Sequence, residues 1–331
     1  MRWNKSIKIF INYFLGPLLF GWLALSIYRQ INNQPQLEAS WQQIRQSFYS
    51  YKAIAFVAVL LLMLINWGIE AWKWKLVISP IYPLTFAAAY KAVLSGVAFS
   101  VTTPNRTGEY VGRILYLPEG SRLKTISVTV VSSISQLLIT MLCGTIAAIA
   151  LKKDLIAHGI ISTIAYQFML YGLIVLVAIL ALLYFRISGI VKIFRYWFQK
   201  SRHLYLVQAL QEFTAPLLWQ LLLLSLLRYS VFIVQYILLF RFFSVYVPIS
   251  AIVYVMSLVF VTMAVIPTIA LVEVGLRGQV SITLMGMFAA GSLGVGLTTV
   301  SVWFINLILP AIIGSVFILG VKVFKRRNEN V

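Results

Sequence analysis

The sequence has few acidic residues, one cysteine and two histidines, and each shortage excludes a class of protein or site. Asp and Glu together account for 8 of 331 residues, and the one aspartate, Asp154, lies in a short Lys-Lys-Asp segment. An enzyme that uses an acidic base or an aspartate-bound metal has few residues to work with here. Cys143 lies in an apolar run, which excludes an intrachain disulfide and a cysteine-based metal site. His158 and His203 lack partners at ligand spacing, so we expect no metal and no other cofactor.

Hydrophobic residues, by contrast, make up 61% of the chain, charged residues make up 11%, and the mean hydropathy is +0.93. Water-soluble domains do not have this composition. Apolar runs of about 20 residues recur from end to end, and this is the length that an α-helix needs to cross ~30 Å of hydrocarbon. The sequence therefore predicts an all-α polytopic membrane protein, with residues 1–331 forming a single integral membrane domain.

The chain is also strongly basic, with 27 Lys and Arg and a net charge of +19. In a soluble protein this excess would indicate nucleic acid, but in a membrane protein the anionic cytoplasmic surface accounts for it, and we expect no nucleic-acid partner. The stretch RISGIVKIFRYWFQK, residues 186–200, has apolar residues at helical spacing and basic residues on other faces. That pattern is typical of a helix lying in the cytoplasmic interface, although a solvated linker is the alternative.

Two stretches of the chain repeat one pattern, in which an apolar helix runs into a proline and a Glu then precedes an Arg by four residues. They are TTPNRTGEYVGR, with Glu109 and Arg113, and IPTIALVEVGLRG, with Glu273 and Arg277. Glu four residues before Arg puts both side chains on one helical face, and the proline breaks the incoming helix. Each motif therefore predicts a broken helix with a charged pair near its new N-terminus. The residues expected at the breaks are Pro104, Gly108, Pro267 and Gly275.

The repeat suggests a topology of six full spans and two re-entrant hairpins. We expect the hairpins at 84–117 and 250–288 and the spans at 9–28, 53–72, 126–151, 156–185, 216–240 and 297–319. Cytoplasmic segments then carry sixteen basic residues, Lys73 among them, against six outside, and both termini are cytoplasmic. The halves, 1–165 and 166–331, form an inverted-topology repeat. A nine-span arrangement with the N-terminus outside would also leave the basic excess inside.

Several charged residues fall within the apolar segments, where a charge costs roughly 2.5–3.5 kcal/mol at the bilayer centre and is expected to face the bundle interior. Five are cations and three are anions, so the interior is net positive and suits a phosphate-bearing head group better than a cation. The candidate head-group residues are Lys91, Arg106, Arg113, Arg228, Arg277, Glu70, Glu109 and Glu273. Further hydrogen bonds could come from Asn66, Gln136, Gln235 and Asn306.

Six of the eight head-group candidates, and the four amides, also have a purely structural explanation. The two Glu–Arg pairs could neutralise each other and hold the helix breaks. Glu70 closes a predicted span and could reach interfacial water, and Arg106 could be an interface anchor. The four amides are equally consistent with contacts between helices.

With these two motifs, the chain resembles the lysylphosphatidylglycerol synthase transmembrane-domain family, in which the bacterial multiple peptide resistance factor carries this region as its lipid-flipping half. The resemblance covers essentially the whole chain. Family members read Thr-Pro-Gly-Gly-x-Gly-Glu in the first motif, and Asn105 and Arg106 replace the two adjacent glycines here. They read Gly-x-Arg-Glu in the second, where Gly278 replaces the glutamate and Glu273 is the candidate to supply that carboxylate.

The resemblance implies a lipid-translocating or lipid-binding module for an anionic or polyprenyl-linked lipid in the bacterial inner membrane. Aminoacyl transfer belongs to a separate soluble domain of the family, which we expect to be absent, so an enzymatic role is the less favoured reading. The alternatives are a transferase acting on a lipid-linked sugar and a scaffold that presents lipid to a partner enzyme. The expected partners are thus membrane lipids and, for the scaffold, a lipid-modifying enzyme.

Overall fold

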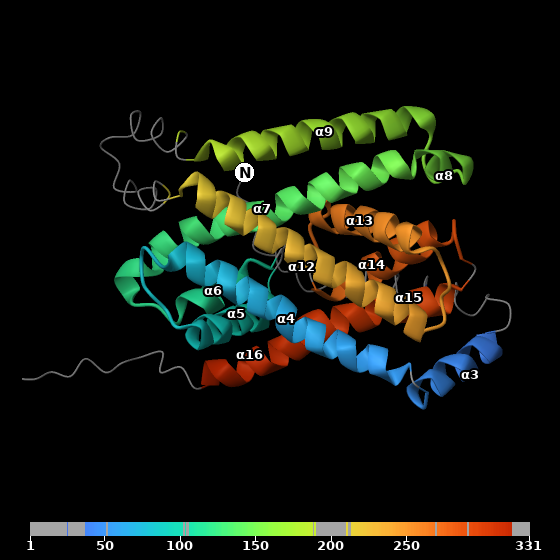
Figure 1. Cartoon of the computed structure of the whole chain (residues 1–331), viewed down its shortest axis with the longest axis horizontal. Helices are drawn as coiled ribbons and strands as arrows, with labels where there is room; N and C mark the ends of the chain where they lie inside the picture. The colour runs from blue at the N-terminus through green and yellow to red at the C-terminus, as the bar shows by residue number, and fades with distance from the viewer. Residues whose placement is uncertain are drawn as a thin grey trace, which may run out of the picture.

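The structure, a computed structural model, describes residues 37–50, 52–101, 103, 106–187, 213–268, 270–289 and 291–319, with isolated positions 25, 189 and 210. All elements in these ranges are helices (Figure 1). Nearly all of the predicted first span, most of the basic stretch 186–200, and Pro104 of the first break lie outside the described residues. The prediction of an all-α polytopic membrane protein is confirmed.

Five helical segments are long and apolar enough to cross a membrane, and each corresponds to a predicted span. They are α4 (Ala53–Ile78), α7 (Glu119–Ala150), α9 (Thr163–Phe185), α12 (Ala215–Phe242) and the run Ser292–Ile318. Four boundaries differ from the prediction by five residues or more, and they are the end of α4 and the starts of α7, α9 and the run Ser292–Ile318. α4 continues to Ile78, so Lys73 lies inside the helix and not in a cytoplasmic segment. α9 begins late because the short helix α8 (Lys152–Ala157) and a turn precede it.

The last long segment contains a widened turn. It consists of α15 (Ser292–Trp303), the π-helix η4 (Phe304–Ile308) and α16 (Leu309–Leu319). α15 packs against α14 (Ala270–Met285), whereas α16 packs against α5 (Phe86–Ser100). The two ends of this segment therefore contact different hairpins.

Two broken helices form the hairpins. In the first, α5 is followed by a break and α6 (Gly108–Ile114), and in the second, α13 (Ile249–Val265) is followed by α14. Because α5 has 15 residues and α13 has 17, both are shorter than the ~20 residues that a full span needs. Gly108 is the first residue of α6 and Pro267 lies in the second break. Gly275 instead lies inside α14, because that helix already begins at Ala270.

Glycines allow the first hairpin to pack backbone against backbone. A Cβ added to Gly112 of α6 would lie 2.5 Å from the carbonyl oxygen of Ser95 in α5. On another face of α5, a Cβ on Gly314 of α16 would lie 1.9 Å from the carbonyl oxygen of Leu94. Helix pairs inside membranes are commonly built on small residues that permit such approach. α5 is thus held tightly between α6 and α16.

The two hairpins lie toward opposite ends of the molecule, with α4 and α12 running antiparallel between them (Figure 1). α5 of the first hairpin packs against α16, and α13 of the second packs against α7. Each hairpin therefore contacts the last long helix of the other half. An inverted repeat of 1–165 and 166–331 would give this reciprocal packing, and the repeat itself stays a prediction.

α9 lies at the side of the bundle, and only 11% of its most apolar window is buried inside the protein. Two tyrosines attach it at its ends. The hydroxyl of Tyr166 donates to the carbonyl of Ala148 at 3.1 Å, and that of Tyr184 donates to Leu218 at 2.7 Å. The remaining surface of α9 is apolar, as expected for a helix that faces lipid.

Candidate functional site

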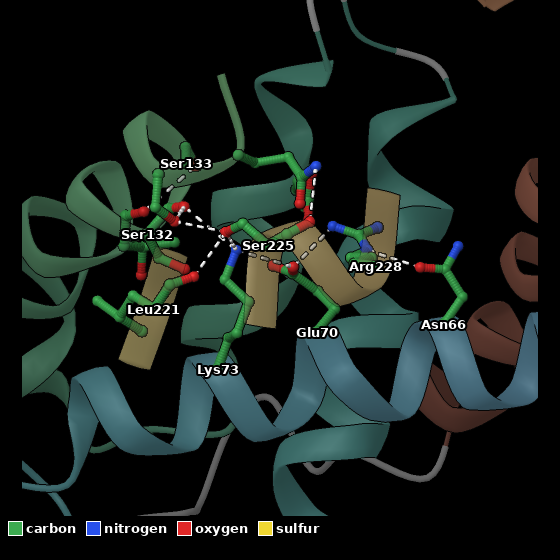
Figure 2. Close-up of polar contacts among 12 residues, drawn as sticks. Asn66, Glu70, Lys73, Ser132, Ser133, Leu221, Ser225 and Arg228 are labelled. Atoms are coloured by element: carbon green, nitrogen blue, oxygen red, sulfur yellow. Dashed lines mark hydrogen bonds and ion pairs between the residues drawn. The ribbon is translucent and has the colours of Figure 1, made fainter. Parts of the chain in front are cut away.

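The buried charges form two clusters, of which the first is centred on Glu70 of α4. Arg228 of α12 places a guanidinium nitrogen 2.7 Å from the Glu70 carboxylate, and Lys73 Nζ lies 3.9 Å from it (Figure 2). Arg113 of α6 places a guanidinium nitrogen 2.7 Å from the other oxygen of the same carboxylate. Arg113 also bonds Glu109, the partner that the sequence motif predicts. We call these five residues the Glu70 cluster. It joins α4, α6 and α12.

Lys73 is the member of this cluster that sequence reasoning missed. Its side chain is 1% exposed, and Nζ donates to Ser225 Oγ at 2.8 Å and to the Ser132 carbonyl at 3.4 Å (Figure 2). Its position one helical turn after Glu70 was an available signal, because residues three apart lie on one face of a helix. Glu70 itself is buried, so the interpretation of Glu70 as an interfacial residue does not describe this structure.

The second cluster joins the two hairpins. Glu273, in the first turn of α14, accepts from Arg277 Nη2 at 2.6 Å, which is the pair that the motif predicts. Arg106, in the break of the first hairpin, reaches the same carboxylate, with Nη2 3.0 Å from each oxygen. We call Arg106, Glu273 and Arg277 the Glu273 cluster. This cluster places the break of the first hairpin beside the first turn of α14 in the second hairpin.

The backbone of the first break explains how Arg106 gets there. Arg106 has a φ of 56°, a left-handed conformation that favours glycine. After it, Thr103 Oγ1 accepts from the Gly108 backbone N–H at 2.7 Å and fixes the start of α6. A Cβ on Gly108 would lie 2.3 Å from the carbonyl oxygen of Phe99, so this close return of the chain needs glycine. The turn thus directs an arginine toward the second hairpin.

A cavity of about 530 Å³ lies against the Glu273 cluster. Arg106, Arg228, Arg277 and Glu273 line it, together with the second break and apolar side chains of α12 and α13. Arg228 falls near the middle of α12, so the cavity reaches the central part of the bundle. The other lining residues are Gln136, Thr140, Tyr229, Phe232, Phe260, Met263, Ala264, Val265, Ile266, Pro267 and Thr268.

The remaining predicted residues take other places. Lys91 is exposed, with Nζ 5.8 Å from the Phe317 ring centre, and belongs to neither cluster. Glu70, Glu109 and Arg113 contribute to the Glu70 cluster but lie outside the cavity lining.

All four candidate amides connect helices. Asn306 of η4 donates to Gln235 of α12 at 3.0 Å and accepts from Asn66 of α4 at 3.3 Å. Arg228 Nε continues this chain by donating to Asn66 at 2.9 Å. Gln136 of α7 donates through Nε2 to the Ser225 carbonyl of α12 at 3.5 Å. It also lines the cavity, and its Oε1 is buried without a hydrogen-bond partner.

Taken together, the two clusters hold five cations and three carboxylates. The two clusters therefore carry a net charge of +2, as the sequence predicted for the interior, but the fifth cation is Lys73 and not Lys91. Among the described residues there is no group of three or more His, Cys, Asp or Glu side chains that could hold a metal ion. The arrangement is suited to binding an anion through arginine, because the planar guanidinium matches phosphate and carboxylate oxygens.

Comparison with known families places this geometry in context. The family described as the lysylphosphatidylglycerol synthase TM region matches residues 13–314. The chain belongs to this family. The match to the lysylphosphatidylglycerol synthase TM region takes in both hairpins and both charge clusters, and it makes the chain an integral membrane protein with a lipid-related role. No curated protein and no solved structure matches the chain.

Proposed function

We propose that this protein holds the anionic head group of a membrane lipid in the cavity between its hairpins and moves that lipid between the two leaflets. The observation that carries the proposal is the cavity lining, in which Arg106, Arg228 and Arg277 come from three different elements and share the wall with one carboxylate, Glu273. Transport proteins commonly bind their substrates near the bilayer midplane between discontinuous helices.

The apolar part of the lining supports a lipid over a soluble anion. Phe232, Phe260 and Met263 line the same cavity as the arginines, and Val265 and Ile266 at the second break are 58% and 39% exposed. A volume of about 530 Å³ accommodates a head group. In this proposal the head group passes the arginines while the acyl chains stay in the bilayer, so the protein shields only the polar part.

The test is lipid movement in sealed proteoliposomes that contain the full chain and lipids with a fluorescent label on an acyl chain. An impermeant reductant destroys the label in the outer leaflet, and continued loss of signal then reports movement from the inner leaflet. We expect wild-type protein to move an anionic lipid and Arg277→Ala to slow that movement about tenfold, since a charge-assisted hydrogen bond contributes roughly 1.5–3 kcal/mol. Protein-dependent movement that is unaffected by Arg277→Ala would overturn this site assignment.

The same preparation separates the alternatives. Lipid that binds without moving would favour a module that presents lipid to a partner enzyme, and a new lipid product on chromatography would favour a transferase.

The proposed orientation, with both termini in the bacterial cytoplasm, places Lys152 outside and Arg186 inside. Single cysteines at these two positions in a Cys143→Ala background should react with an impermeant thiol reagent from opposite sides. Reaction from one side would overturn the inverted arrangement.

A further inference from the structure

Glu273 connects the two hairpins at the wall of the cavity. One of its oxygens accepts from both Arg106 and Arg277, at 3.0 and 2.6 Å, and the other accepts from Arg106 at 3.0 Å. Arg106 belongs to the first hairpin and Arg277 to the second, and all three side chains line the cavity. A single carboxylate therefore binds two arginines at the place where a head group would bind.

A phosphate group would compete for the same donors. Guanidinium binds carboxylate and phosphate through the same planar fork. A terminal phosphate monoester offers three oxygens and about −1.5 to −2 charge near neutral pH, whereas a carboxylate offers two oxygens and one charge. A phosphate diester carries a single charge and only equals Glu273, and a zwitterionic head group brings no net charge. A monoester is therefore the head group best able to replace the carboxylate.

The charge of the two clusters points to the same class of ligand. The Glu273 cluster has two arginines and one carboxylate. The Glu70 cluster has three cations and two carboxylates, and its Arg228 also lines the cavity. Each cluster thus has one positive charge in excess, and unneutralised charge is unfavourable at membrane depth. A ligand with two negative charges at the cavity would neutralise both.

Arg106 is the partner that Glu273 can lose most easily. Its side chain is 43% exposed, against 13% for Arg277, and it extends from a break and not from a regular helix. Its left-handed backbone is unfavourable for a residue with a Cβ. The contact between the hairpins therefore depends on an exposed side chain on an irregular segment.

We propose that Glu273 is an internal substitute for the ligand's phosphate, and that the cavity consequently selects lipids whose head group ends in a phosphate monoester. The bound phosphate takes Arg106 and Arg277 from Glu273 and so breaks the ion pair between the two hairpins. This inference rests on the proposed function, because it requires the cavity to receive a lipid head group.

The selection is tested by calorimetric titration of the purified full chain in detergent at pH 8. The titrants are dihexanoyl phosphatidic acid, dihexanoyl phosphatidylglycerol and dihexanoyl phosphatidylcholine, which share their acyl chains and differ in head-group charge. We expect phosphatidic acid to bind at least tenfold more tightly than phosphatidylglycerol, and phosphatidylcholine to bind most weakly. Equal affinity for the two anionic lipids would overturn the selection. Inorganic phosphate is a fourth titrant, and an affinity equal to that of phosphatidic acid would identify free phosphate, not lipid, as the ligand.

The role of Glu273 is tested with Glu273→Gln and a matched control, Glu119→Gln, which removes an exposed carboxylate from the first turn of α7. Because a neutral amide competes poorly for arginine, Glu273→Gln should tighten binding of both anionic lipids at least fivefold, and Glu119→Gln should leave both affinities within twofold. Unchanged or weaker binding by Glu273→Gln would show that Glu273 is a brace and overturn the substitution mechanism.

A second variant keeps the test decisive if Glu273→Gln does not fold. Arg106→Gly suits the left-handed backbone and removes one of the two arginines, so the preference for phosphatidic acid over phosphatidylglycerol should fall below threefold. An unchanged preference would overturn the proposal. If the protein moves all labelled lipids at equal rates and Arg277→Ala slows each of them, the proposed function holds and the selection is rejected. If the protein neither binds nor moves any lipid, the proposed function itself is rejected.

Discussion

Arg113 and Arg277 occupy the same place in two copies of one motif, yet their surroundings differ. Arg113 is 3% exposed, and a second carboxylate, Glu70, accepts from the nitrogen that also bonds Glu109. Arg277 bonds Glu273 and lines the cavity. The first pair is enclosed by a long helix, while the second faces a space large enough for a ligand.

The difference originates in what lies beside each hairpin. α4 and α12 bring Glu70 and Arg228 against the first pair, whereas the second pair receives Arg106 from the opposite hairpin. A Glu–Arg pair at this spacing is a local feature of one helix. Its role is therefore decided by the third charged group that packs against it, which suggests a brace in the first hairpin and a binding site in the second.

The largest effect should follow from removing the carboxylate that closes the first pair. Glu70→Gln leaves Arg113, Arg228 and Lys73 without their shared partner, and breaking a buried ion pair in this way typically costs about 3–5 kcal/mol. Thermal unfolding in detergent measures the loss, with Glu119→Gln as the control for a removed carboxylate. Equal stability of the two variants would contradict the bracing role of Glu70.

The comparison itself is tested by replacing the two arginines in turn. Arg113→Ala should lower thermal stability and lipid movement together. Arg277→Ala should slow lipid movement about tenfold while stability changes much less, and Arg277→Lys should restore part of the rate because lysine lacks the planar fork. Both quantities are measured on the same preparations. Parallel losses of stability and movement in Arg277→Ala would make the second pair a brace like the first.

A smaller effect should come from the packing of the first hairpin. Gly112→Ala places a methyl group against the Ser95 carbonyl, and overpacking of this kind costs about 1–3 kcal/mol. Gly172→Ala is the matched control, because a Cβ there meets no atom within 4 Å. Thermal unfolding should show a loss for the first variant and none for the second. Equal stability would mean that α5 and α6 are free to separate.

The smallest effect is expected at Lys91, which the sequence placed among the head-group residues. Lys91→Ala should change lipid movement by less than about twofold, because substitutions at exposed positions usually alter free energies by no more than ~0.5 kcal/mol. The proteoliposome assay measures it beside Arg277→Ala. A loss as large as that of Arg277→Ala would extend the binding site beyond the cavity lining.

The sequence predicted the spans well because bilayer thickness sets helix length, and the five long segments fall close to their expected places. It misplaced the end of α4, where a basic residue after an apolar run was interpreted as the start of a cytoplasmic segment. Lys73 in fact continues the helix and finds Ser225 of α12 as its partner. Whether a terminal charge lies in water or in the bundle depends on neighbouring helices, which one sequence does not place.

The contacts between charged residues also divide into those that local sequence predicts and those that depend on neighbouring helices. Helix geometry alone gave Glu109 with Arg113 and Glu273 with Arg277. The contacts between elements join residues far apart in the chain, with Arg228 and Glu70 separated by 158 positions and Arg106 and Glu273 by 167. These contacts follow from the tertiary packing of the hairpins, so local spacing carried no signal for them.

The π-helix η4 divides the last long segment between the two hairpins, since α15 packs on α14 and α16 packs on α5. A continuous α-helix would act as a stiff rod that joins the hairpins. Within η4 the regular hydrogen-bond ladder is interrupted, and the amide of Asn306 fixes this turn to Gln235 and Asn66. The segment therefore departs from a regular α-helix at the level of the bundle interior, between the part that packs on one hairpin and the part that packs on the other.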